Sequence, residues 1–166
     1  MAAPTNDDFE DLLLSCRYGD LDDVRAFVDK FGPEAVASAR DENGNTVLHM
    51  TCANGHEDVL TFLLPFLPPS LLATSNNSKS TALHWAATNK HLGVVQKLAG
   101  AQPSLIDVKN AAGRTPLGEA ELAEWDSGAQ WMVGAMVIGE NDLKEGVTDE
   151  VVEEDQEGHS DATIKH

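Results

Sequence analysis

The segment Asp41-Glu-Asn-Gly-Asn-Thr-Val-Leu-His49 decides the fold, because two later segments of the chain repeat it. The copies are Asn76-Asn-Ser-Lys-Ser-Thr-Ala-Leu-His84 and Asn110-Ala-Ala-Gly-Arg-Thr-Pro-Leu117. Their threonines are 35 and 34 residues apart. A fixed period of this length is typical of a stack of small units that bury their apolar faces against one another. Such stacks usually act by presenting a surface to a partner.

Each unit is interpreted as a finger followed by two helices. Thr46 is placed to cap a first helix, since its hydroxyl can accept a hydrogen bond from an otherwise unpaired backbone N–H. Gly55 suits a left-handed turn at the end of that helix, and an apolar second helix follows. We therefore expect an all-α solenoid of about four helix-turn-helix units. Their expected boundaries are near residues 7–40, 41–75, 76–109 and 110–138.

The first unit lacks the finger pattern but keeps both helices. Cys16 and Gly19 precede Cys52 and Gly55 by 36 residues, about one repeat. This unit is therefore expected to be a terminal cap, with one polar and one apolar face. The two cysteines should fill the same small buried position in successive units, which Ala87 fills in the third, and remain free thiols.

The repeat pattern stops near Gly139. Residues 140–157 hold nine acids, one lysine and no aromatic residue. A segment of this composition cannot bury enough apolar surface to offset the entropy lost on ordering. We expect a repeat domain over residues 1–138 and a disordered acidic tail over residues 139–166.

The charge balance restricts the kind of partner. The chain has 166 residues with 28 acids and 11 bases, a formal net charge of −17. Binding to phosphates requires clustered Lys and Arg, so direct binding to nucleic acid is not expected. No apolar run is long enough to span a membrane, and the acidic start is not typical of a secretory signal. The excess of acids favours a basic protein partner, or serves solubility alone.

The repeated segments resemble the ankyrin repeat. The match is close at Thr46-Val-Leu-His49 with Cys52-Ala-Asn-Gly-His56, and again at Thr81-Ala-Leu-His-Trp-Ala-Ala87. The resemblance covers about residues 7–138. The chain departs from the family pattern at Lys79, which replaces the turn glycine, and at Gly118, which replaces the histidine. The second departure is typical of a last unit that no further unit covers.

A narrower resemblance is to a small fungal group of ankyrin-repeat chaperones. It rests on Thr-Ala-Leu-His-Trp-Ala at 81–86, a degenerate last unit with Glu119-Ala-Glu121, and the acidic tail. The resemblance implies a dedicated chaperone of a newly made basic ribosomal protein, the third of the small-subunit series. It also implies a role in assembling the 40S subunit, in cytoplasm and nucleus. The alternative is a general ankyrin adaptor or regulator with another protein partner, and a monomer is expected in either case.

Acids are crowded into the first and last units, whereas residues 59–106 contain none. A basic partner would meet attraction at both ends of the stack. The inner face is expected to contain Arg17, Tyr18, Ala53, Asn54, Thr88, Asn89, Leu122 and Ala123. We expect partner-binding residues among these positions, the finger tips and the crowded acids. The candidates are Glu10, Asp11, Tyr18, Asp20, Glu42, Asn54, Asn89, Glu119, Glu121, Glu124, Trp125 and Asp126.

Aromatic residues leave two alternatives open. Tyr18, the only tyrosine, is either an exposed anchor for a partner or a packed residue of the cap. Trp85 occupies the position of Met50 in the preceding unit, and such pairs are usually core residues. Of Trp125 and Trp131, one should pack inward and the other mark an exposed patch.

No pattern supports catalysis or a cofactor. The chain has no Gly-rich phosphate loop, nucleophile elbow or zinc-hydrolase helix. His49, Cys52 and His56 have a spacing that could suit zinc, but Gly55 interrupts the helix and a fourth ligand is missing nearby. The histidines match family positions that serve hydrogen bonding. We expect no enzyme, no metal site and no cofactor.

Overall fold

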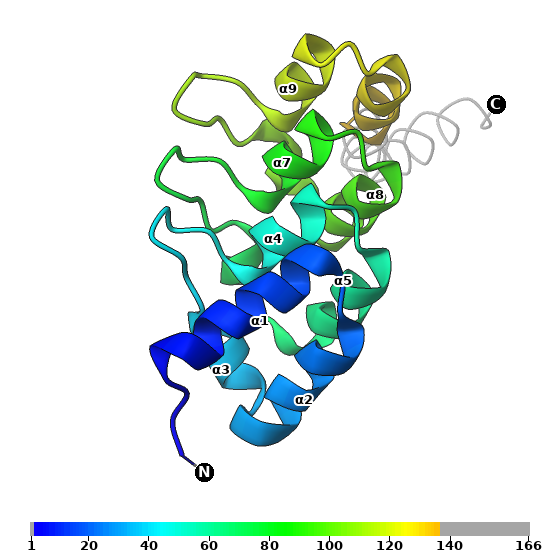
Figure 1. Ribbon diagram of the computed structural model, residues 1–166. Coiled ribbons are helices and arrows are strands. Elements are labelled where there is room, and N and C mark those ends of the chain that lie inside the picture. Colours follow the sequence, from blue (N-terminus) through cyan, green and yellow to red (C-terminus); the bar gives the residue numbers. More distant parts are fainter. Residues whose placement is uncertain (1, 137–166) are drawn as a thin grey trace, which may run out of the picture. The chain divides into compact units, whose positions relative to one another are not determined.

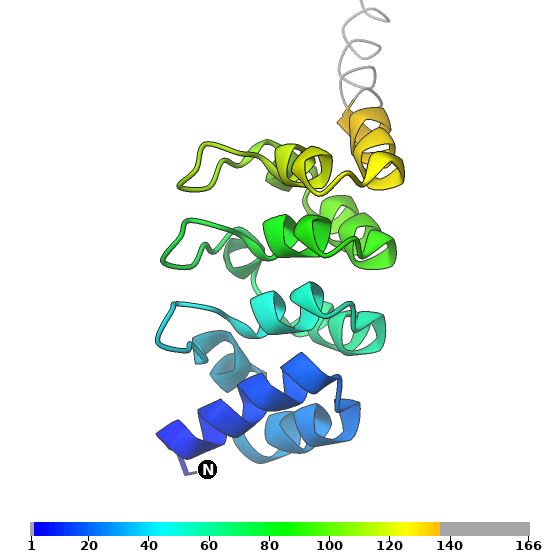
Figure 2. The same ribbon diagram turned by 45° about the horizontal axis from the view of Figure 1, so that its top comes forward.

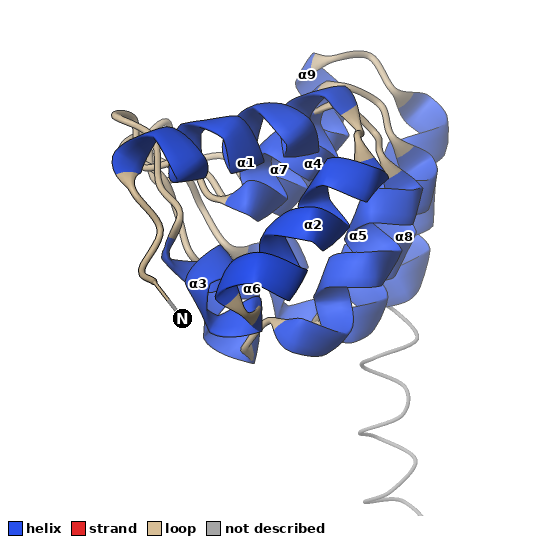
Figure 3. Cartoon of the chain, turned by 60° about the horizontal axis from the view of Figure 1, so that its bottom comes forward, coloured by secondary structure: helices blue, strands red, loops and turns tan. Residues whose placement is uncertain are grey.

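The computed structural model describes residues 2–136, which contain helices, turns and loops but no strand (Figure 3). Residues up to Met132 belong to one compact unit, and the chain from Val133 belongs to another, of which residues 133–136 are helical. The predicted tail, residues 139–166, lies outside the described residues. The prediction of an all-α repeat array is confirmed.

The helices of residues 2–132 form two columns (Figures 1 and 2). The inner column contains α1 (Asn6–Tyr18), α4 (Val47–Ala53), α7 (Ala82–Thr88) and α9 (Pro116–Leu122). The outer column contains α2 (Leu21–Phe31), α5 (Glu57–Leu63), α8 (Leu92–Ala101) and the helical residues 126–132. The connectors contain α3 (Pro33–Ser38), η1 (Leu64–Phe66), α6 (Pro69–Leu72) and η2 (Pro103–Asp107). Four layers of two helices result, with the fingers on one side (Figure 2).

A side chain at the base of each finger holds its turn together. In the first finger, Asp41 Oδ1 accepts hydrogen bonds from the backbone N–H groups of Asn43, at 2.9 Å, and Asn45, at 2.8 Å. Asn76 and Asn110 hold the next two fingers in the same way. Asp and Asn favour such turns because their short side chains bond to the backbone two residues on. The fingers therefore present a regular edge to solvent.

Lys79 occupies the turn position of the second finger in the left-handed conformation, with φ of 59°. Glycines take this position in the other fingers, at Gly44 and Gly113. The substitution noticed in the sequence therefore leaves the turn unchanged, although a side chain here is strained relative to glycine.

Threonine and histidine together start two of the inner helices. Thr46 caps α4 as predicted: its hydroxyl accepts from the N–H groups of Leu48 and His49. The His49 ring completes the box, because its Nδ1 accepts from the Thr46 N–H at 3.1 Å. Thr81 and His84 repeat the ring bond at the start of α7, where His84 Nδ1 accepts from the Thr81 N–H at 3.1 Å. Since Nδ1 accepts, Nε2 must carry the proton of the neutral ring.

Histidines also bridge neighbouring units, in two directions. His49 and His84 point forward: their Nε2 groups bond to the carbonyls of Ser80 and Arg114, at 2.8 and 2.9 Å, in the next finger. A second pair points backward. His56 bonds to the Arg17 carbonyl at 2.8 Å, and His91 to the Ala53 carbonyl at 3.0 Å. The units are therefore joined by polar bonds as well as by apolar packing.

The backward bridges explain two glycines. Gly19 ends α1, and Gly55 precedes α5. Both glycines take the left-handed conformation, with φ of 77° for Gly19 and 74° for Gly55. A Cβ at Gly19 would lie 2.5 Å from the His56 ring, and one at Gly55 would lie 2.6 Å from the His91 ring. In the third unit, Lys90 occupies the position of these glycines. The fourth unit has Trp125 at the position of His56 and His91, so no histidine ring of the described residues packs against Lys90.

We expect acid to destabilise the repeat domain. Burial lowers the pKa of His49 and of His84 below the ordinary value of 6.5. Above pH 6.5 the rings are neutral in both the folded and unfolded states, so their full contribution to stability is present. As the pH falls below 6.5, the unfolded chain binds protons first and the free energy of unfolding decreases.

Urea denaturation at pH 7.5 and pH 5.5 measures this effect. The midpoint should be lower at pH 5.5, and the difference should shrink in a His49→Leu variant. That variant corrects for the carboxylates, whose protonation affects both proteins alike. An equal pH dependence in the two proteins would show that His49 does not contribute.

The two cysteines lie in the predicted small position. Cys16 and Cys52 are free and fully buried, as is Ala87 in the third unit. Burial raises the pKa of the Cys16 thiol to about 12 and also raises the pKa of the Cys52 thiol. Since the thiolate is the reactive form, both groups should be inert in the native protein.

A thiol reagent such as Ellman's reagent should therefore react with neither cysteine within minutes under native conditions. Both should react at once in concentrated guanidinium chloride. Fast reaction of one thiol in the native protein would contradict the packing between α1 and α4.

Candidate protein-binding surface

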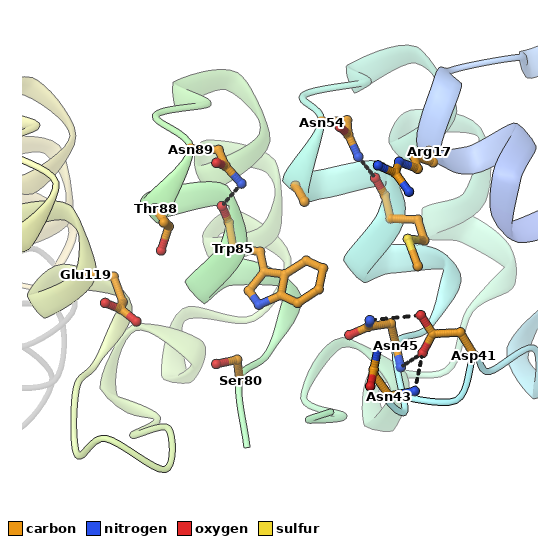
Figure 4. A pocket seen from close by; sticks show the side chains of 12 residues that line it. Arg17, Asp41, Asn43, Asn45, Asn54, Ser80, Trp85, Thr88, Asn89 and Glu119 are labelled. Carbon is orange, nitrogen blue, oxygen red and sulfur yellow. Dashed lines mark hydrogen bonds between the residues drawn. The ribbon is translucent and has the colours of Figure 1, made fainter. Parts of the chain in front are cut away.

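The inner helices and the fingers enclose a hollow of about 660 Å³ that crosses the four layers of helices in residues 2–132. Trp85 lies near its centre, with Glu119 on one side and Arg17 and Asp41 on the other (Figure 4). We call this hollow the central groove. Its twelve lining residues are Arg17, Asp41, Asn43, Asn45, Met50, Ala53, Asn54, Ser80, Trp85, Thr88, Asn89 and Glu119.

Helical spacing explains how the groove is lined. Met50, Ala53 and Asn54 are separated by three and four residues, so they lie on one face of α4. Trp85, Thr88 and Asn89 repeat the spacing on α7. Five of the residues expected on the inner face line the groove: Arg17, Ala53, Asn54, Thr88 and Asn89. Tyr18, Leu122 and Ala123 do not line it.

The prediction that Trp85 is a core residue is wrong. Trp85 is half-buried and lines the groove, and its ring forms a T-shaped pair with the His49 ring, with centroids 5.4 Å apart. Met50 is also half-buried. Both residues were missed as surface candidates, although their three-residue spacing from Ala53 and Thr88 would have found them. The groove therefore has an apolar floor.

Amide side chains give the groove neutral hydrogen-bonding groups. Asn54 Nδ2 donates to the Met50 carbonyl at 2.8 Å, and Asn89 Nδ2 donates to the Trp85 carbonyl at 3.0 Å. These bonds close the ends of α4 and α7. Each Oδ1 is left as an acceptor, so the two predicted residues present equivalent acceptors one repeat apart.

Glu119 is held inside the last unit. Its Oε1 accepts from Arg114 Nε at 2.8 Å, and its Oε2 accepts from Asn110 Nδ2 at 2.8 Å. The Arg114 guanidinium balances the Glu119 charge, which therefore attracts a basic partner less than the sequence suggested. Arg114 and Glu119 instead brace the finger whose carbonyl accepts from His84.

Two further hollows lie between α1 and the first finger. One, of about 740 Å³, contains Glu10, Asp41 and Glu42 among its lining residues, together with Arg40. The other, of about 280 Å³, contains Leu13, Leu14 and Met50. Both include Glu10 and Asp41 in their walls, and the smaller one shares Arg17, Asp41 and Met50 with the central groove.

Other predicted residues of the first unit lie apart from these hollows. Tyr18 is 70% exposed, so it is a surface residue and not a packed residue of the cap. The Arg17 guanidinium lies 5.8 Å from the centroid of the Tyr18 ring. Asp11 lines a separate hollow beside Asp23 on α2. Asp20 caps α2 by accepting from the Asp23 N–H, which gives it a structural role.

The predicted residues of the last unit do not converge on the groove. Glu121 and Asp126 are exposed, and Glu124 takes the left-handed turn position with φ of 57°. Trp125 and Trp131 are both half-buried, so the expectation of one buried and one exposed indole is wrong. The Trp125 ring occupies the space beside Gly128, where a Cβ would collide with it.

A candidate metal site and a membrane-spanning helix are both absent from the described residues. Among residues 2–136, no group of three His, Cys, Asp or Glu side chains is placed to hold a metal ion. The rings of His49 and His56 are committed to carbonyls of opposite neighbouring units. In the same residues, no helix has the length and apolarity needed to cross a membrane.

These features define a protein that binds other proteins through stacked repeats. The family described as "Ankyrin repeats (3 copies)" matches residues 12–110, and the chain belongs to this family. The resemblance seen in the sequence is thereby confirmed.

A crystal structure of yeast ribosomal protein Rps3 with its chaperone Yar1 contains a similar fold. The neighbour is the ankyrin-repeat chaperone. The match has a TM-score of 0.75 and 26% sequence identity, and it covers 79% of this chain and 94% of the other. An ankyrin repeat-containing protein of Schizosaccharomyces pombe is 45% identical over 49 residues. That alignment covers 30% of this chain and 32% of the relative.

Proposed function

We propose that this protein is an escort chaperone for a basic ribosomal protein of the small subunit. It binds the newly made protein, keeps it soluble and supports 40S assembly, in cytoplasm and nucleus. It acts as a monomer, by binding and without catalysis. The observation that carries the proposal is the likeness to Yar1, which extends over 94% of that chaperone.

Charge supports the proposal independently of the fold. The chain has a net charge of −17, opposite in sign to the charge of a basic ribosomal protein. An acidic surface accelerates the encounter with such a client and is screened by salt. The central groove adds an apolar floor at Met50 and Trp85 with amide acceptors at Asn54 and Asn89, which can hold a segment after the encounter.

Co-expression with the Rps3-like protein of the same source tests the proposal. We expect a stable complex on size exclusion at low salt, a client that stays soluble, and a complex that weakens at high salt. Aggregation of the client with no complex at either salt concentration would overturn the proposal.

Matched variants locate the binding face. An Asn54→Ala/Asn89→Ala variant removes the two groove acceptors, whereas Asp22→Asn/Asp29→Asn removes two exposed charges from α2 in the outer column. The first variant should lose affinity and the second should bind nearly as the wild type does. Unchanged affinity in the first variant together with a loss in the second would mean that total charge, and not the groove, retains the client.

The half-exposed Trp85 favours one alternative function, a general ankyrin adaptor that binds an apolar side chain of its partner. Salt separates the two functions. An adaptor of this kind should keep its affinity as ionic strength rises, because apolar burial is not screened. Affinity purification from cells should then recover a protein other than a ribosomal one.

A further inference from the structure

We propose that the hollows between α1 and the first finger form a two-part subsite for a basic side chain next to an aliphatic one. This inference deepens the proposed function and rests on it for the identity of the partner. The two parts are an acidic notch, formed by Glu10, Asp41 and Glu42, and an aliphatic hollow, formed by Leu13, Leu14 and Met50.

One face of α1 forms one wall of the subsite. Glu10, Leu14 and Arg17 are four and three residues apart, so they follow one another along the helix. All three line the aliphatic hollow. Leu14 is 47% exposed although it is a large apolar residue. An exposed leucine inside a hollow provides apolar area that a partner can cover.

The first finger forms the opposite wall of the notch. Asp41 accepts three hydrogen bonds from Asn43 and Asn45, so its carboxylate is fixed in place. Glu10 and Glu42 are exposed, and their carboxylates form no ion pair or hydrogen bond with the other described residues, although the Glu42 carbonyl accepts from Asn77 Nδ2 at 3.3 Å. A preorganised carboxylate between two adaptable ones is suited to a guanidinium or ammonium group.

The neighbouring basic groups set the direction of the bound segment. Arg40 lines the notch, but its guanidinium donates to the carbonyls of Ala37 and Ala39, both at 2.8 Å. The notch therefore contains three carboxylates and one cation, and the hydrogen bonds of that cation go to backbone carbonyls. Arg17 lies where the aliphatic hollow meets the central groove. A basic residue is thus attracted at the finger end and repelled at the Arg17 end.

Because Glu10 and Asp41 line both parts, the two client side chains must be neighbours in space. The partner is accordingly a protein segment with Arg or Lys beside Leu, Ile, Val or Met. This chemistry agrees with a basic ribosomal protein but does not depend on it. The subsite adds selectivity for a side-chain pair to the general attraction between acids and bases.

Two variants with matched controls test the subsite, using the full chain and the purified Rps3-like protein. Glu10→Gln/Glu42→Gln should weaken binding about fivefold at low salt and reduce the salt dependence, because two exposed charges are lost. Leu14→Gln should weaken binding about tenfold at every salt concentration. The controls are Asp22→Asn/Asp29→Asn for charge and Leu92→Gln for an exposed leucine on α8. Thermal melts of all variants check that the fold is kept.

A peptide array separates this inference from the proposed function. Wild-type protein should prefer peptides with a basic and an aliphatic residue, and the two subsite variants should lose that preference. If the Rps3-like protein does not bind but the preference is present, the proposed function fails and the subsite stands. If the ribosomal protein binds equally to the wild type and the subsite variants, or the array shows no preference, the subsite is overturned while the escort function stands.

Discussion

Replacing Ala86 with glutamate is expected to unfold the repeat domain. Ala86 lies in the middle of α7, is fully buried, and belongs to the helix that packs against both α4 and α9. A glutamate there either carries a charge into an apolar contact or requires the layers to separate. Burying an unpaired charge costs several kcal/mol, which is comparable with the whole stability of a small domain, about 5–15 kcal/mol.

Circular dichroism during heating measures the effect. The variant should lack the cooperative transition of the wild type or melt far below it. Ala26→Glu is the matched control, because Ala26 is an exposed residue within α2, and its melting temperature should be nearly unchanged. A soluble Ala86→Glu protein with a wild-type melt would mean that position 86 does not lie between the layers.

The second large effect is expected for His49→Leu. The fully buried His49 ring accepts from the Thr46 N–H and bonds to the Ser80 carbonyl. Leucine fills a similar volume but leaves the Thr46 N–H without a partner, and it removes one of the two bonds to the Ser80 carbonyl, which still accepts from the Asn76 N–H at 2.9 Å. Since an unsatisfied buried group costs about 1–3 kcal/mol and a lost hydrogen bond about 0.5–1.5 kcal/mol, the free energy of unfolding should fall by about 2–4 kcal/mol.

Urea denaturation of His56→Leu provides the comparison. His56 also bonds to a carbonyl, that of Arg17, but the bond lies where water can replace it. The loss of stability there should be under about 1 kcal/mol, as is usual for an exposed hydrogen bond. If both variants lost the same amount of stability, burial of the Thr46–His49 box would not explain its contribution.

Much of the fold could be predicted because the repeat fixes it locally. A threonine that caps a helix, a histidine three residues later and a left-handed turn recur at one period, and each has a physical role that the residue type reveals. Cys16, Cys52 and Ala87 fill equivalent buried positions for the same reason. The first unit was recognisable as well, since its helices keep the register without the finger.

The binding surface could be predicted only in part. Register placed Asn54 and Asn89 on the inner face, but it did not separate groove residues from core residues one turn away, as Trp85 shows. Counting charges in the sequence could not distinguish a carboxylate without hydrogen-bond partners from one that is bonded within the fold. Glu10 has no bonded partner among the described residues, whereas Glu119 is held by Arg114 and Asn110, and Asp20 caps a helix. Such differences depend on neighbours distant in sequence.

The two directions of histidine bridging make the junctions between layers unequal. The junction between the second and third units has both a forward bridge, from His49, and a backward bridge, from His91. The first junction has only the bridge from His56, and the last only that from His84, because Leu13 and Trp125 occupy the missing histidine positions. Amide hydrogen exchange should therefore be slowest in the centre and faster in both outer layers. The outer layers also carry most of the acids of residues 2–136, so the layers with the strongest attraction for a basic partner are those that open most readily.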